Sequence, residues 1–108
     1  MSVKLRLSKN QLEGLYLFVK DGLERNPPEN LPDSLIHDLM DKLLERLRNK
    51  VRKISSNNKS VLSLTLSPIE AKTFHCWYQH VKTDMQPHYT YEVIVCDGIY
   101  RDIDRECA

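Results

Sequence analysis

Hydrophobic and polar residues alternate over two short stretches of the chain, residues 3–7 and 62–66. In each stretch every second residue is Val or Leu, and the residues between them are polar. A period of two is typical of a β-strand that buries one face. Each stretch runs directly into a helical pattern, so the sequence predicts two strands that are each followed by a helix.

A serine stands at each junction between strand and helix. Ser67 is followed by Pro68 and, three residues on, by Glu70, which is the arrangement of a capping box. Ser8 and Gln11 offer the same arrangement with an amide in place of the carboxylate. A serine in this position stabilises the start of a helix by about 1 kcal/mol, because its oxygen accepts a hydrogen bond from an otherwise unpaired backbone N–H.

Apolar residues at spacings of three and four predict further helical segments. We expect a first helix over residues 9–24, a second that is capped by Asp33 or Ser34, and a third over residues 68–84. The second has the broadest apolar stripe, which favours contact with more than one neighbouring helix: Leu35, Ile36, Leu39, Met40, Leu43, Leu44, Leu47, Val51 and Ile54.

Two glycines, Gly14 and Gly22, lie inside the first predicted helix. A glycine there costs up to about 1 kcal/mol relative to alanine, so it indicates a place where another helix comes close. Leu17 falls outside the apolar stripe of this helix, and we expect its side chain to face water.

The final segment carries two conflicting signals. Residues 89–95 are rich in strand formers, and Asp97-Gly98 is a hairpin-turn signal. Against a strand, apolar residues recur every four positions, as in a helix. We predict a helix, because local propensity yields to tertiary context more readily than the apolar pattern does. The recurring residues are Tyr91, Val95, Ile99 and Ile103.

The two strand–helix patterns align when Ser8 is placed on Ser67, which also places Leu15 on Phe74 and Phe18 on Trp77. We therefore predict an α+β, mostly helical fold in a single domain, residues 1–108. It consists of two pseudo-symmetric β-α-α units, residues 2–54 and 61–107, with a polar linker over residues 55–60. A two-stranded antiparallel ribbon is marginal in water, so a four-helix core must pack on its leucine face.

Composition describes an ordinary soluble globular protein, with 108 residues, a formal charge of +1 and 41% hydrophobic residues. No apolar run approaches the length of a membrane span, and the N-terminus lacks the apolar region of a secretory signal. The three cysteines show no disulfide-framework spacing. Reduced thiols and a cytoplasmic location are the expected reading.

Candidate chemistry is sparse. Cys76, His80 and Asp84 follow one another at intervals of four on the third predicted helix, and these residue types can ligate zinc. They also lie opposite the apolar stripe, where an exposed polar face is the simpler interpretation. His75 borders that stripe and is expected to pack, and Cys96 is expected to be a buried thiol. No catalytic or phosphate-binding motif occurs, so we predict no enzyme activity and no cofactor.

Basic residues crowd the second half of the second predicted helix, at Arg46, Arg48, Lys50, Arg52 and Lys53. Cations there complement the helix dipole without any partner. The alternative interpretation is a patch that binds the phosphates of DNA or RNA, although few base-reading side chains accompany it.

The segment LSPIE, residues 66–70, resembles the opening helix of sigma-factor and response-regulator helix-turn-helix domains. The resemblance ends there, because residues 80–92 lack the glycine turn and the polar recognition helix of those domains. Helix capping explains the shared residues, so the DNA-binding function is not carried over.

The sequence thus predicts a small non-enzymatic protein-interaction or regulatory module, with nucleic-acid binding as the alternative. The second strand carries the neutral Ser63 and Thr65, whereas the first carries Lys4 and Arg6. Charged side chains protect strand edges from pairing. We therefore expect homodimerisation through the edge of the second strand or through exposed helix faces.

Overall fold

The computed structural model describes residues 2–54 and 61–107. In chain order they form β1 (Val3–Leu7), α1 (Lys9–Arg25), α2 (Leu31–Ile54), β2 (Leu62–Leu66), α3 (Pro68–Met85) and α4 (Thr90–Cys107). The mostly helical α+β fold is confirmed, and so is the helix predicted for the final segment. The linker predicted over residues 55–60 lies outside the described residues.

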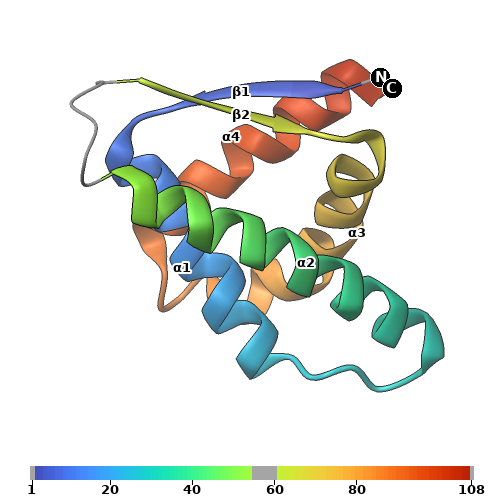
Figure 1. Cartoon of the computed structure of the whole chain (residues 1–108). Coiled ribbons are helices and arrows are strands. Elements are labelled where there is room, and N and C mark those ends of the chain that lie inside the picture. The colour runs from blue at the N-terminus through green and yellow to red at the C-terminus, as the bar shows by residue number, and fades with distance from the viewer. Residues whose placement is uncertain (1, 55–60, 108) are drawn as a thin grey trace.

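β1 and β2 form an antiparallel two-stranded ribbon that crosses one end of the helices (Figure 1). Leu5 lies opposite Leu64, with Val3 opposite Leu66 and Leu7 opposite Leu62. The apolar residues of both strands face the helices, and the polar residues between them are exposed. The alternation in the sequence therefore reflects one buried face, as predicted.

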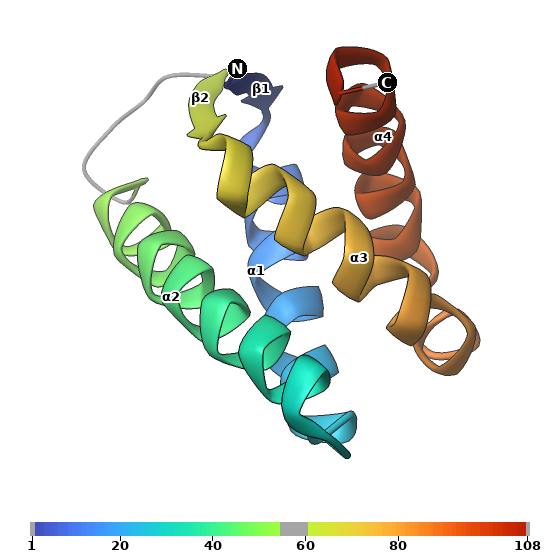
Figure 2. The ribbon, with the colours of Figure 1, turned by 90° about the vertical axis from the view of Figure 1, so that its right-hand side faces the viewer.

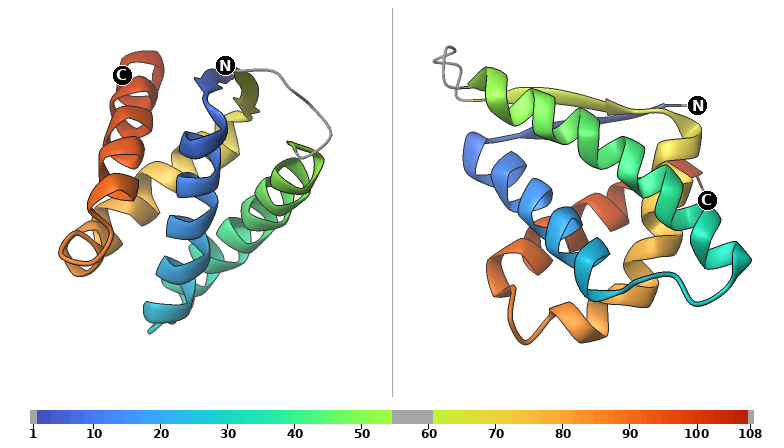
Figure 3. Two further views of the ribbon diagram at one scale, coloured as in Figure 1. Left: turned by 90° about the vertical axis from the view of Figure 1, so that its left-hand side faces the viewer. Right: turned by 60° about the horizontal axis from the view of Figure 1, so that its bottom comes forward.

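The four helices surround a common core. Figure 2 shows α1 between α2 and α4 with α3 crossing in front of it, and the left view of Figure 3 shows the same arrangement from the opposite side. α1 packs against both α2 and α4, and α3 packs against the same two helices. The broad stripe of α2 thus contacts two neighbouring helices, as expected. The largest fully buried side chains of the core include Tyr78, Phe18, Phe74, Leu5, Leu12, Met40, Leu47, Leu64, Met85 and Ile103.

The serine caps form as the sequence predicts. The backbone N–H of Gln11 donates to Ser8 Oγ at 3.1 Å, and that of Glu70 donates to Ser67 Oγ at 3.1 Å. Both reciprocal bonds of the capping boxes are present as well. The caps therefore end each strand and begin each helix within one residue.

The close helix approach predicted at Gly14 and Gly22 is confirmed. A Cβ atom added to Gly14 would lie 3.2 Å from Tyr91 Cε2, and one added to Gly22 would lie 2.7 Å from Trp77 Cη2. Leu17 is 39% exposed, as expected. The glycines thus let α1 lie against aromatic side chains of α4 and α3.

Two details of the prediction were wrong. α2 begins at Leu31 and is capped by Asn30, whose side-chain oxygen accepts a hydrogen bond from the Asp33 N–H at 2.8 Å. The helix can include Pro32 because the first turn needs no hydrogen bond from that residue. The apolar stripe also reaches further than the core does. Leu35 is 62% exposed and Tyr91 is 46% exposed, and the first turns of α2 project beyond the neighbouring helices (Figure 1).

Candidate functional site

A groove of about 320 Å³ lies where the end of α1, the α1–α2 connection, the start of α2 and the second half of α3 meet. We call it the Trp77 groove; Arg25, Pro28, Ile36, Trp77, His80 and Val81 are among its lining residues. Both helix–helix connections lie on the side of the molecule away from the ribbon (Figure 3, right). Pro27 and Pro28 keep the α1–α2 connection extended, so it does not continue either helix.

Trp77 supplies a rigid, buried part of the groove lining. Its side chain is 4% exposed, and its ring meets that of Phe18 edge-on with centroids 5.7 Å apart. The indole Nε1 has no hydrogen-bond partner, and it is the one buried side-chain nitrogen or oxygen in this state among residues 2–54 and 61–107. A buried donor without an acceptor costs about 1–3 kcal/mol. Trp77 thus lines the groove and also carries a buried donor whose hydrogen bond is unmade.

The rim of the groove carries charge of both signs. Arg25 Nε donates to Asp84 Oδ2 at 3.1 Å, and a second bond joins Arg25 Nη2 to the other carboxylate oxygen. The hydrogen bonds from Arg25 lower the pKa of Asp84, against a smaller opposing effect of burial. His37, Glu29 and Asp33 also line the groove. The lining is therefore mixed, with charged and polar side chains beside Ile36, Trp77 and Val81.

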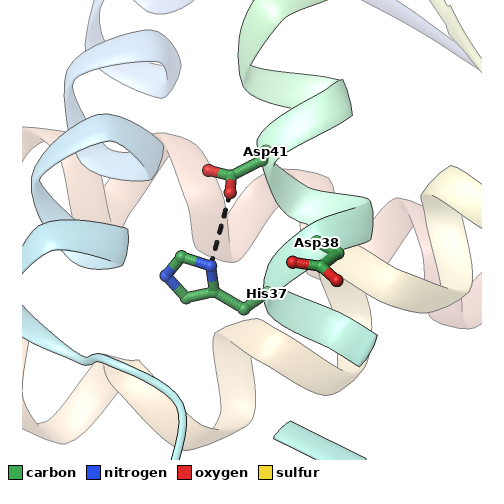
Figure 4. A group of neighbouring side chains, drawn as sticks. All are labelled: His37, Asp38 and Asp41. Carbon is green, nitrogen blue, oxygen red and sulfur yellow. Dashed lines mark ion pairs between the residues drawn. The ribbon is translucent and has the colours of Figure 1, made fainter. Parts of the chain in front are cut away.

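His37, Asp38 and Asp41 form a small cluster on α2, and their potential ligand atoms all lie within 4.8 Å of one another (Figure 4). These residue types can bind zinc. His37 Nδ1 lies 3.4 Å from Asp41 Oδ2, and its Nε2 lies 3.3 Å from the Leu23 carbonyl oxygen. Both nitrogens therefore face acceptors within the chain, and the contact with Leu23 fastens α2 to the end of α1.

Sequence reasoning missed this cluster, although the spacing could have indicated it. Asp41 lies four positions after His37 and three after Asp38, and side chains at these spacings are neighbours on a helix. The regular spacing of Cys76, His80 and Asp84 predicted a metal site on α3 instead. In the described part of the chain, the His37 cluster is the one group whose potential ligand atoms lie close enough together for a metal ion. Cys76, His80 and Asp84 do not form such a group.

The structure disperses the predicted metal candidates along α3. Cys76 and His80 are exposed, and Asp84 pairs with Arg25. His80 lines the Trp77 groove. The three side chains thus lie on an exposed face of α3, and the last of them, Asp84, forms an ion pair.

The other two residues singled out from the sequence behave as packing residues. His75 stacks on Tyr100 with centroids 4.1 Å apart, and its Nε2 lies 2.7 Å from Asp104 Oδ1. Cys96 is fully buried, and burial raises the pKa of its thiol well above the ordinary value. Both therefore tie α4 into the fold.

The basic half of α2 is partly engaged within the chain. Arg46 pairs with Glu70 and donates to the Thr65 carbonyl oxygen at 3.0 Å. Arg48 pairs with Glu45 at 2.6 Å. Lys50 is half-buried, whereas Arg52 and Lys53 are exposed in the last turn. The guanidinium groups of Arg46 and Arg48 are thus already bound to carboxylates.

Comparison with known proteins adds no relative, since no family model, no curated protein and no solved structure matches the chain. None of the described helices combines the length and the apolar character that crossing a membrane requires.

Proposed function

We propose that the protein is a small non-enzymatic protein-interaction module whose partner binds at the Trp77 groove. The observation that carries this proposal is the preformed groove itself, whose lining includes Trp77, the buried residue with an unmade side-chain hydrogen bond. Binding sites are commonly concave, with a small number of polar groups that fix the orientation of the bound partner. Leu31 and Leu35, which are 86% and 62% exposed, lie in the same turns of α2 as the groove residue Ile36 and offer further apolar contact.

We further propose that the chain is a single domain made of two pseudo-symmetric β-α-α units. The register supports this, because Leu5 and Leu64 correspond in the alignment of the two halves and also lie opposite each other in the ribbon. A two-fold axis through that pair exchanges Val3 with Leu62. The same operation exchanges α1 with α3 and α2 with α4, in agreement with the packing of α1 and α3 against the same two helices.

A non-enzymatic role is supported by the state of the reactive groups. His37 and His75 are engaged by aspartates, and the Cys96 thiol is fully buried. Cys76 and Cys96 are both free, which suits a reducing cytoplasm. We therefore retain a cytoplasmic interaction or regulatory role as the proposal.

The test places a photo-crosslinking residue at Glu29, which is exposed and lines the groove, in the protein expressed in its native cell. The matched control places it at Asn10, which is exposed at the start of α1. We expect one defined protein adduct from position 29 and none from position 10. The same adducts from both positions, or none from either, would contradict the proposal.

Homodimerisation is a second possible mode of association within the same proposal. The edge of β2 is partly occupied, because Arg46 donates to the Thr65 carbonyl oxygen, so exposed helix faces are the better supported route. Sedimentation at high concentration tests it, and a strictly monomeric protein would remove it.

Nucleic-acid binding through the second half of α2 remains the alternative. Its support is the clustering of basic residues, and the pairing of Arg46 and Arg48 with carboxylates weakens it. A salt-dependent gel shift with duplex DNA that disappears in the Arg48→Glu, Arg52→Glu double variant would establish it. Absence of binding at low salt would end it.

A further inference from the structure

The connection between α3 and α4 packs differently from the connection between α1 and α2. Tyr89, just before α4, lies against Phe18 with ring centroids 6.5 Å apart and an interplanar angle of 78°. Its hydroxyl donates to Asp21 Oδ2 at 2.6 Å. One tyrosine thus fills the space beside α1 and is held there by an aromatic ring and a hydrogen-bond acceptor.

The two residues that hold Tyr89 have counterparts in the other half of the chain. In the alignment that places Ser8 on Ser67, Phe18 corresponds to Trp77 and Asp21 corresponds to His80. Both Trp77 and His80 line the Trp77 groove. The α1–α2 connection, residues 26–30, reads NPPEN and contains no aromatic residue. The place that Tyr89 takes in one half is therefore a groove in the other.

Trp77 is also the groove residue whose buried indole N–H makes no hydrogen bond. Nε1 has no partner and lies on a side chain that is 4% exposed. The volume of about 320 Å³ lies at the lower end of ligand pockets, which run from about 300 to 1,000 Å³.

We infer that the Trp77 groove receives an unphosphorylated tyrosine side chain from a partner protein, with the ring against Trp77 and the hydroxyl at His80. This inference rests on the proposed interaction function and on the pseudo-symmetry of the two units. Glu29 and Asp33 line the groove and oppose a phosphate, and Arg25 is already paired with Asp84. The charges around the groove therefore favour a neutral phenol over a phosphorylated one.

The test uses the full-length protein and N-acetyl-tyrosinamide as the probe. Trp77 is the single tryptophan of the chain, so the proton NMR spectrum contains one indole N–H resonance that reports on this site. We expect the resonance to move and to saturate, with a Kd of about 1 mM for a ligand of this size. N-acetyl-phenylalaninamide should bind about fivefold more weakly, because it lacks the hydroxyl.

The His80→Ala variant tests the position of the hydroxyl. It should bind the two amides equally, whereas His88→Ala, at an exposed residue in the α3–α4 connection, should keep the fivefold preference. Both substitutions are at exposed positions and should leave the fold intact. An indole resonance that does not respond, equal affinities in the unsubstituted protein, or tighter binding of the phosphotyrosine amide would overturn the inference.

The outcome separates this inference from the proposed function. An adduct from the crosslinker at Glu29 together with an unresponsive indole resonance would leave the interaction module standing and remove the tyrosine. A responsive resonance without any adduct would support the phenol site and remove the protein partner.

Discussion

Replacing Gly22 with alanine tests the helix contact on which the groove depends. The added Cβ would lie 2.7 Å from both Cζ2 and Cη2 of Trp77. Carbon atoms in contact are normally about 3.5–4.0 Å apart. The indole is buried and is packed against the rings of Phe18 and Phe74, so it cannot move away freely.

Two opposing effects set the size of the change. Alanine in place of glycine stabilises a helix by about 1 kcal/mol. Forcing a methyl group into a packed core costs about 1–3 kcal/mol. We therefore expect Gly22→Ala to lower the free energy of unfolding by about 1 kcal/mol. Trp77 should also shift within the groove, which the indole resonance would report.

The chain provides matched controls for this substitution. Gly98 lies in α4, and an added Cβ would meet nothing within 4 Å, so Gly98→Ala should stabilise the protein by about 1 kcal/mol. The space around Gly14 is intermediate between that at Gly22 and that at Gly98. Its added Cβ would lie 3.2 Å from a ring atom of Tyr91, which is 46% exposed and can give way. Gly14→Ala should therefore change stability little.

Urea unfolding followed by circular dichroism measures all three variants on one scale. In thermal unfolding each kcal/mol should move Tm by about 4–8 °C for a chain of this size, with the Gly22 and Gly98 variants moving in opposite directions. If Gly22→Ala proves as stable as Gly98→Ala, the contact between α1 and Trp77 is looser than described, and the reasoning about the groove fails with it.

Three further predictions concern the caps, the rim and the core. Ser67→Ala should lose about 1 kcal/mol of stability through the lost cap, whereas Ser63→Ala on the exposed face of β2 should change it by less than about 0.5 kcal/mol, measured by urea midpoints. Arg25 lowers the pKa of Asp84. The stabilisation of the fold by this ion pair is therefore fully present above the ordinary Asp pKa and is lost as pH falls through the lowered pKa. Arg25→Gln should thus be less stable than the unsubstituted protein at neutral pH and equal to it in acid, and a pH-independent difference would contradict this. The buried Cys96 thiol should resist a thiol reagent in the native protein and react in urea, as peptide mapping by mass spectrometry would show.

Local signals were sufficient where the physics is local. The alternation around Leu5 and the capping box at Ser67 each depend on neighbouring residues, and both formed as predicted. The helix α4 was harder, because its early residues favour a strand. The spacing of Val95, Ile99 and Ile103 decided correctly, since all three are buried in the helix. The spacing of apolar residues indicates which face of an element is buried. In α4 the burial of that face outweighs the intrinsic strand propensity of the first residues.

Predictions failed where the outcome depends on how far a neighbouring element reaches. Leu35 belongs to the apolar stripe of α2, yet it is 62% exposed because no other helix extends over it. Asp84 shares a helix face with His80, yet Arg25, 59 residues away, takes its carboxylate. Spacing along one helix cannot reveal either fact, because both are set by residues distant in the sequence.

The groove was beyond sequence reasoning for a related reason. In the sequence Trp77 is one more residue of an apolar stripe, and nothing there indicates that its N–H lacks an acceptor. The α1–α2 connection has no aromatic side chain that could fill the groove. The apolar pattern of a helix does not reveal such an empty place, because the pattern depends only on the residues of that helix. The proposed repeat supplies such information, because Tyr89 packs against Phe18 and Asp21, which align with the groove residues Trp77 and His80. The proposed internal repeat therefore supplies an argument about the site that no motif in the chain supplies.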